Sequence, residues 1–364
     1  MRINNENYHT IWVKENDSKT IQIIDQRYLP FEFRIAELRS EEDIFVAIKE
    51  MWLRGAPLIG VAGAYGMYLG LLGLGSQEMM DERITKIASY LKSARPTAVN
   101  LQFAIDLVTE EIKKEKSLDK KIKMAFETAN NLKNKELENC FKIGEFSLPF
   151  IEKISKSKKG GVVNILTHCN AGWLACIDYG TATAPIYLAH KKGIKIHVWV
   201  DETRPRNQGA RLTAFELGQE GIPHTVIADN TGGLLMQKGM VDMVIVGSDR
   251  TSVNGDVANK IGTYLKALAA YDNNIPFYVA LPLSTIDWDI EDGIAGIPIE
   301  IRDESEVRYV EGWDGEKISK LLIMPENSST LNYGFDITPA KYVTALITEK
   351  GVCKATKKDL SKLK

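Results

Sequence analysis

The chain has 364 residues, enough for two domains, and its hydrophobic content of 44% is sufficient for well-packed cores. The net charge of −2 provides no overall field that would recruit nucleic acid or an anionic membrane. Four irregularly spaced cysteines do not make a disulfide framework, and residues 1–6 contain no apolar signal core. We therefore expect a cytoplasmic globular protein whose partners include neither nucleic acid nor a membrane.

The N-terminal part of the sequence predicts a small antiparallel sheet followed by helices. Apolar and polar residues alternate at 11–13, 21–25 and 31–34, which is typical of short strands. Ser40 and Asp43 have the spacing of a capping box and open a helix that we expect to end near Leu53.

A glycine-rich apolar stretch at 58–74 follows Arg54 and Pro57. Although it is about as long as a short membrane span, no other span accompanies it, so we interpret it as a buried helix. Helical patterns continue at 81–94 and from Val99 onward. We interpret the lysine- and glutamate-rich region that follows as a solvent-exposed helical face. We predict a sheet-and-helix domain at 1–130 and a helical connection at 131–160.

From residue 161 onward the pattern predicts an α/β domain with a parallel sheet. Strand-like runs at 162–166, 194–200, 223–227, 243–246 and 276–281 alternate with helical segments at 179–191, 209–220, 232–238 and 259–271. The fold class expected for residues 161–364 is a Rossmann-like parallel-sheet domain. Neither a dinucleotide fingerprint after the first strand nor a P-loop occurs, so we expect no nucleotide cofactor.

Four of the predicted strands end in reactive or polar residues, at 168–170, 201–205, 229–231 and 248–250. Ligands of open parallel sheets bind at the carboxyl ends of the strands, so these residues form the candidate site. Cys169 suits acid–base chemistry, and Asp249 on a nearby strand is its natural partner. His168, Cys169 and Cys176 could suggest zinc, but no second cluster completes four ligands, so we expect no metal.

Several basic residues could bind an anionic substrate. Arg54 precedes the start of the glycine-rich helix, where free amides and the helix dipole favour phosphate, and it is the best candidate. Arg95 stands at another helix junction. Arg204, Arg250 and Lys260 add positive charge near the strand ends.

These residues lie in stretches that resemble the S-methyl-5-thioribose-1-phosphate isomerases of the methionine salvage pathway. The matching stretches include LRGAP at 53–57, RPTAVNL at 95–101, THCNAG at 167–172, DETRP at 201–205, QGARLT at 208–213 and NGDVANKIGT at 254–263. Several such motifs in the same order cover the chain from about residue 21 to residue 351.

The resemblance implies an aldose–ketose isomerase that acts on a small phosphorylated sugar, without metal or nucleotide, usually as a homodimer with a lid closure between its domains. It implies that Cys169 and Asp249 are the catalytic pair, while His168 is structural. The residues that it implies for binding phosphate and sugar hydroxyls are Arg54, Gly55, Ala56, Arg95, Gln208, Asn259 and Lys260.

The sequence departs from the family pattern close to the expected pocket, so the group on the fifth carbon of the sugar stays open. The departures are Trp173, Cys176, Ile177, Asp178, Arg206, Asn207, Ser248 and residues 332–334. A 5-deoxyribose 1-phosphate isomerase is the leading alternative. Two further alternatives stay open. One is a ribose-1,5-bisphosphate isomerase, which Arg206 alone suggests, and the other is a non-catalytic regulatory subunit. We expect Trp173 to influence substrate choice. Proton and hydride transfer both stay open.

Overall fold

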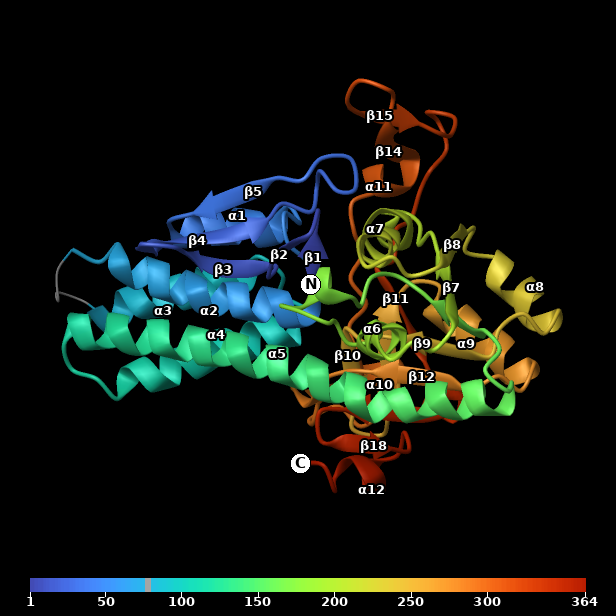
Figure 1. Cartoon of the computed structure of the whole chain (residues 1–364). Helices are drawn as coiled ribbons and strands as arrows, with labels where there is room; N and C mark the ends of the chain where they lie inside the picture. The colour runs from blue at the N-terminus through green and yellow to red at the C-terminus, as the bar shows by residue number, and fades with distance from the viewer. Residues whose placement is uncertain (76–79) are drawn as a thin grey trace.

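The computed structural model describes residues 1–75 and 80–364 (Figure 1). Its N-terminal part contains the antiparallel strands β1 (Arg2–Ile3) with β2 (Glu6–Asn7), and β3 (Ile11–Lys14), β4 (Asp17–Ile24) and β5 (Ile35–Leu38). The prediction of a strand at 31–34 is wrong. This segment turns instead, because the amides of Phe31 and Glu32 both donate to the Tyr28 carbonyl, and the third strand begins only at Ile35.

A bundle of helices packs on this small sheet. The capping box is confirmed, since Ser40 and Asp43 exchange both hydrogen bonds at the start of α1 (Glu41–Lys49). That helix ends earlier than predicted, because Met51 takes a left-handed conformation with φ 57°. The glycine-rich stretch forms α2 (Ala56–Leu72), which is buried along almost its whole length. The helices that follow it in the chain are α3 (Met80–Ser93) and α4 (Val99–Lys113).

Close packing explains the glycines of α2. A Cβ atom at Gly63 would lie 2.5 Å from the Leu101 side chain on α4, so a larger residue would push the two helices apart. Among the described residues, no helix is both long and apolar enough to cross a membrane.

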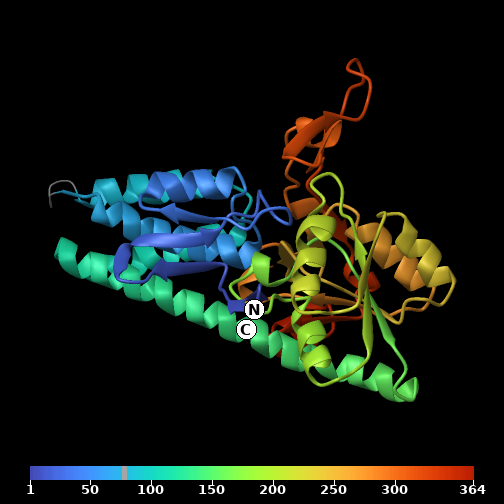
Figure 2. The same ribbon diagram turned by 45° about the horizontal axis from the view of Figure 1, so that its top comes forward.

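One long helix joins the two ends of the molecule. Helix α5 (Leu118–Ser157) has 40 residues and contacts α2 and α4 with one part and α6 (Ala184–Lys191) and β17 (Ala345–Thr348) with another (Figure 2). The division into 1–130, 131–160 and 161–364 stays a prediction. The helix itself begins before residue 131 and ends just before the glycine pair at 160–161.

The C-terminal part contains a seven-stranded sheet with the order β18-β17-β12-β9-β6-β7-β8. All pairs are parallel except β17 with β18. Ile165 and Leu166, adjacent on β6, belong to different core clusters, so both faces of the sheet are buried. The predicted α/β class is therefore confirmed. The remaining strands are β6 (Val163–Thr167), β7 (Ile196–Asp201), β8 (His224–Ile227), β9 (Met243–Val246), β12 (Phe277–Ala280) and β18 (Gly351–Cys353).

Two of the predicted helices in this part begin later than expected. Helix α6 starts at Ala184 rather than 179, because a 3-10 turn (Trp173–Ala175) and a loop follow β6. Helix α9 (Thr263–Asp272) starts after residues 257–260, which form β11 (Val257–Lys260). The other helices are α7 (Ala214–Gln219), which follows a π-helical turn at Gly209–Thr213, α8 (Thr231–Gln237), α10 (Gly293–Gly296) and α12 (Lys357–Leu360).

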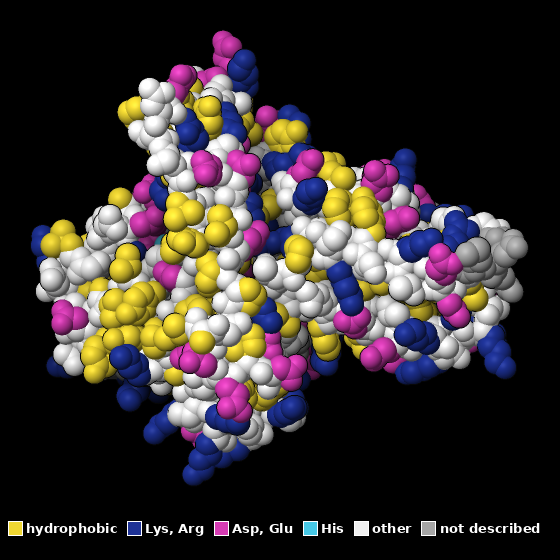
Figure 3. Space-filling view, turned by 180° about the vertical axis from the view of Figure 1, so that it is seen from behind, with side chains coloured by type: hydrophobic (Ala, Val, Ile, Leu, Met, Phe, Trp, Pro, Cys, Tyr) yellow, Lys and Arg dark blue, Asp and Glu magenta, His cyan; other side chains and the backbone are white. Residues whose placement is uncertain are grey.

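A second, four-stranded sheet has the order β13-β10-β11-β16, formed by β13 (Ile286–Asp287), β10 (Arg250–Ser252), β11 and β16 (Phe335–Thr338). Beyond it, α11 (Ser305–Arg308) and the hairpin of β14 (Tyr309–Trp313) and β15 (Ile318–Leu322) project from the body of the molecule. Figure 3 shows this projection from behind, with apolar side chains gathered on the body below it.

Candidate active site

A narrow cleft, partly open to solvent, lies where the start of α2 meets the carboxyl ends of β6 and β9. All of the predicted catalytic and binding residues line this one cleft, although they come from distant parts of the chain. They are Arg54, Gly55, Ala56, Arg95, Cys169, Gln208, Asp249, Asn259 and Lys260.

Cys169 stands directly after β6 in a conformation that few residues with a side chain adopt. Its φ is 68°, in the left-handed region. Two threonine hydroxyls hold this turn: Thr203 Oγ1 accepts from the Cys169 amide at 2.8 Å, and Thr213 Oγ1 donates to the Cys169 carbonyl at 2.7 Å. A strained residue held from both sides is typical of a functional site.

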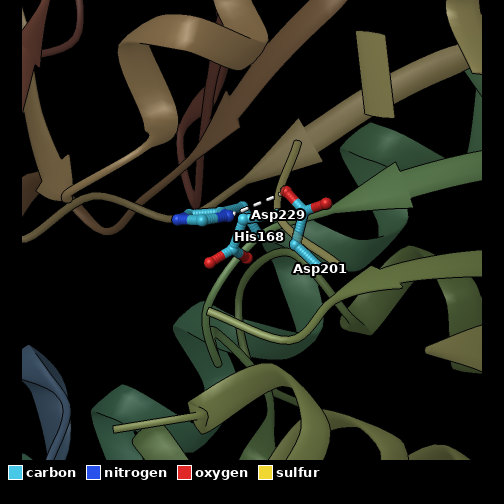
Figure 4. A group of neighbouring side chains, drawn as sticks. All are labelled: His168, Asp201 and Asp229. Atoms are coloured by element: carbon cyan, nitrogen blue, oxygen red, sulfur yellow. Dashed lines mark hydrogen bonds and ion pairs between the residues drawn. The ribbon is translucent and has the colours of Figure 1, made fainter. Parts of the chain in front are cut away.

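The neighbouring His168 is buried and fixed at both ring nitrogens. Nδ1 lies 2.8 Å from Asp201 Oδ2, and Nε2 lies 2.8 Å from the carbonyl oxygen of Ile261 (Figure 4). Both partners offer oxygen atoms to the ring, which is therefore held from two sides. The contacts agree with a structural role for His168.

Among the described residues, His168, Asp201 and Asp229 bring ligand atoms within 4.8 Å of one another, as a metal site would (Figure 4). These atoms are engaged in other contacts. Asp201 Oδ2 also pairs with Lys266 Nζ at 3.3 Å, and the Asp229 carboxylate accepts from the amides of Thr203 and Arg204 at 2.7 and 2.8 Å. A lysine ammonium therefore compensates the charge that a metal ion would otherwise balance.

The Arg54 segment is bound directly to the loop that follows Cys169. Arg54 is buried, and its Nη2 donates to Asn170 at both the carbonyl oxygen, at 2.8 Å, and Oδ1, at 2.7 Å. Gly55 has a φ of 106°, and a Cβ atom there would lie 2.3 Å from the Ala175 carbonyl oxygen. Among the described residues no side chain caps α2, so the amide of Ala56, which lines the cleft, is available to an anion there, while Pro57 has no amide hydrogen.

Asp249 and Lys260 approach the cleft from the opposite side. Asp249 follows β9, and its amide donates to the Ala258 carbonyl of β11 at 3.0 Å. Asn259 and Lys260 lie on β11 rather than on the predicted helix. Lys260 Nζ donates to the Gly334 carbonyl at 3.0 Å and lies 5.0 Å from the centre of the Phe335 ring.

The titratable groups of the cleft influence one another. Burial raises the pKa of the Cys169 thiol, while the positive charges of Arg54 and Lys260 oppose this shift. Burial also raises the pKa of Asp249, against the opposing charges of Lys260 and Arg95. Burial lowers the pKa of Lys260, and both acidic groups counteract that change. A thiol and a carboxyl that hold protons readily thus face several cations, which suits acid–base catalysis on an anion.

Two buried polar atoms at the cleft have no hydrogen-bond partner within the part of the chain described. They are Gln208 Oε1 and Arg95 Nε. Buried polar atoms in native proteins are nearly always satisfied, and because both residues line the cleft, a polar ligand there could supply the missing partners. Arg95 also binds Glu300 through Nη2 at 2.9 Å.

Some sequence-based expectations near the cleft are wrong. Trp173 is fully buried in the core and does not line the cleft, because the 3-10 turn directs it inward. Of the other departures, only Cys176 and Ser248 line the cleft. Arg204 and Arg250 do not line it, since Arg204 donates to the Val307 carbonyl at 3.0 Å and Arg250 pairs with Asp287.

Glu216, which the sequence pattern did not single out, organises the loop after Cys169. This fully buried carboxylate accepts from the Asn170 side chain at 2.9 Å and from the amides of Trp173 and Leu174 at 3.1 and 2.9 Å. A Cβ atom at Gly172 would lie 1.7 Å from its Oε2. The one available signal in the sequence is that this acidic residue falls at a position of the helical pattern where a buried residue is expected.

Comparison with known proteins shows the family of this chain. The model of the initiation factor 2 subunit family matches residues 53–355. A methylthioribose-1-phosphate isomerase of Desulfatibacillum aliphaticivorans is 54% identical over 363 residues, which cover 100% of this chain and 98% of that protein.

Two solved structures are also similar over almost their whole lengths. The crystal structure of 5-methylthioribose 1-phosphate isomerase from Pyrococcus horikoshii OT3 is 36% identical, with a TM-score of 0.85, and the match covers 98% of this chain and 96% of that chain. The translation initiation factor eIF-2B, subunit delta, from A. fulgidus is 37% identical, with a TM-score of 0.79, covering 98% and 99%. The chain therefore belongs to the initiation factor 2 subunit family and to its methylthioribose-1-phosphate isomerase group.

Proposed function

We propose that this protein is the aldose–ketose isomerase that converts S-methyl-5-thioribose 1-phosphate into S-methyl-5-thioribulose 1-phosphate in methionine salvage. The observation that carries the proposal is the cleft itself, in which Cys169 and Asp249 face Arg54, Arg95 and Lys260. The 54% identity to a protein named for this activity supports the choice of substrate.

Binding starts with the phosphate. Arg54 and the open amide of Ala56 at the start of α2 suit its oxygens, and the Arg95 guanidinium still has donors that its one bond to Glu300 does not use. Gln208 and Asn259 offer amide groups to the sugar hydroxyls. We infer that a sugar bound in this way presents its anomeric carbon to the thiol and the carboxyl, which line the same cleft.

The reaction requires one proton to be donated, one to be accepted and one hydrogen to move between carbons. The phosphate on the first carbon locks the ring, so the ring oxygen must gain a proton as its bond to that carbon breaks. The hydrogen on the second carbon then moves to the first, either as a proton through an enediol or as a hydride, and the hydroxyl proton of the second carbon leaves as its carbonyl forms. We assign the donor and the acceptor to the pair of Cys169 and Asp249.

A 5-deoxyribose 1-phosphate isomerase is the second candidate, because Cys176 and Ser248, which depart from the family pattern, line the cleft. The ribose-1,5-bisphosphate alternative loses its support. Arg206 is outside the cleft and pairs with Glu306 at 3.0 Å, so its charge is not available to a second phosphate there.

The test is a direct assay of the purified protein on both sugars, with kcat/KM compared side by side. If neither aldose is converted into its ketose, the isomerase proposal is wrong and a regulatory role gains support. If Cys169→Ser keeps the rate within about tenfold of wild type, ~1.4 kcal/mol of barrier, the catalytic assignment is wrong instead.

We also propose that the protein works in the cytoplasm as a homodimer. Large apolar side chains are exposed on α9 and on the projecting hairpin, including Leu265 (57% exposed), Tyr271 (65%) and Leu321 (60%), and such surfaces are typical of subunit contacts. Sedimentation equilibrium should give twice the 40.7 kDa chain mass, and a monomer at micromolar concentration would contradict this proposal.

A further inference from the structure

The projecting hairpin is joined to the body by a short two-stranded stalk, which we define as residues 300–302 and 332–334. Ile301 and Tyr333 form an antiparallel bridge between its two segments. The Arg302 amide donates to the Asn332 carbonyl, and the Gly334 amide donates to the Glu300 carbonyl, both at 2.8 Å. The stalk is therefore an ordered element rather than a loose connection.

A row of ion pairs runs through the stalk to the cleft. Glu300 binds Arg95 Nη2 at 2.9 Å with one carboxylate oxygen and Arg302 Nη1 at 2.9 Å with the other. Arg302 in turn binds both oxygens of Glu306, at 2.6 and 2.9 Å, and Glu306 also binds Arg206 at 3.0 Å. The charges alternate in sign along the row, with Arg95 at its cleft end.

The other segment of the stalk holds a second cation of the cleft. The Gly334 carbonyl accepts the hydrogen bond from Lys260 Nζ at 3.0 Å, and Phe335, the next residue, contacts the same ammonium. Neither Glu300 nor Arg302 lines the cleft itself. Their contacts therefore reach the cleft through Arg95 and Lys260, while their charges also act on it directly, as the Glu300 charge does on Asp249.

We propose that the stalk is a positioning element of the active site, in which Glu300 and Arg302 aim the Arg95 guanidinium at the sugar phosphate while Gly334 aims Lys260. The inference rests on the proposed function. Its physical basis is that Arg95 lines the cleft and its Nη2 is anchored by Glu300, so the remaining guanidinium donors, among them Nε, which has no partner among the described residues, keep a fixed direction. A long arginine side chain without such an anchor loses orientation on becoming mobile.

Glu300→Gln separates positioning from plain electrostatics, because the two effects have opposite signs. Removing a negative charge near the cleft strengthens the attraction for phosphate, whereas losing the anchor weakens the contact with Arg95. Positioning predicts that kcat/KM falls at least about tenfold, ~1.4 kcal/mol, mainly through KM. In an Arg95→Met background the same change should alter kcat/KM less than about twofold, since the residue acts through Arg95.

The matched control is Glu311→Gln. This substitution breaks the 3.1 Å ion pair between Glu311 on the hairpin and Arg211 on the body, and it leaves the stalk residues unchanged. It should leave kcat/KM and the melting temperature unchanged. Arg302→Lys is the second variant, because it keeps the charge but cannot bind two carboxylates as a planar fork. We expect it to lower kcat/KM about threefold to tenfold.

Calorimetric titration with inorganic phosphate provides a measurement that does not depend on turnover. If Glu300→Gln binds phosphate more weakly than wild type, the result supports the positioning role of the stalk, even if the isomerase assay fails on every sugar. An unchanged or improved kcat/KM in a folded Glu300→Gln protein overturns the inference. An equal loss in the Arg95→Met background also overturns it, since the effect would then not pass through Arg95.

Discussion

The strained backbone at Cys169 leads to a prediction in which stability and activity separate. With φ at 68°, a residue that has a Cβ atom loses about 1–2 kcal/mol, and glycine does not. In Cys169→Gly this gain is offset by about 0.5–1 kcal/mol of chain entropy and by roughly 1 kcal/mol of lost thiol contacts. We therefore expect the free energy of unfolding to change by no more than about 1 kcal/mol.

Activity should respond differently. An acid–base group contributes about 10²–10⁴-fold to the rate, ~3–5 kcal/mol of barrier, so kcat of Cys169→Gly should fall by at least about 100-fold. Urea denaturation and the isomerase assay measure the two effects on the same preparation.

Cys176→Gly is the stability control. This buried thiol lies at φ −124°, where glycine relieves no strain, and we expect a loss of about 2 kcal/mol. If Cys169→Gly destabilises the protein as much as this control does, the strain argument is wrong. If it keeps kcat within about tenfold of wild type, the thiol is not catalytic.

Further substitutions test the rest of the cleft. Asp249→Asn keeps the shape but cannot transfer a proton, so kcat should fall about 10²–10⁴-fold with an unchanged melting temperature, and a milder loss would assign the second acid–base role elsewhere. Lys260→Met removes a cation that favours the ionised forms of Asp249 and Cys169, so their pKa values should rise and both limbs of the kcat/KM profile should move to higher pH. A downward movement would show that these groups do not titrate in the profile. Gly55→Ala forces a Cβ atom against the Ala175 carbonyl at φ 106° and should lower the unfolding free energy by more than about 2 kcal/mol in thermal denaturation, whereas a neutral result would contradict the packing described.

Much of the site was predictable because it depends on a rule of topology. Cys169 and Asp249 follow β6 and β9, which are neighbours in the sheet, so two polar strand ends far apart in the sequence had to meet at one edge. The start of α2 was recognisable from Arg54 before a glycine-rich helix. The buried character of that helix followed from its composition alone.

What the sequence could not reveal depends on contacts between distant segments. Residues 259–260 were expected to open a helix, yet they belong to β11 because β16, more than 70 residues later, pairs with this strand. That pairing, rather than helical spacing, brings Asn259 and Lys260 to the cleft. Trp173 was misplaced for a similar reason, since the 3-10 turn after β6 breaks the helical spacing on which its predicted position depended.

The electrostatics of the cleft link phosphate binding to proton transfer. In the free protein, burial favours the neutral forms of Cys169 and Asp249, while the nearby cations of Arg54, Arg95 and Lys260 partly reverse that preference. A bound phosphate shares those cations and adds negative charge, so it weakens their effect on the two acids. Binding therefore shifts both groups toward their protonated forms at the moment when the ring oxygen needs a proton. If the proposed roles are right, the cations that hold the substrate also set the pKa values of Cys169 and Asp249, and the stalk acts on proton transfer as well as on affinity through Arg95 and Lys260.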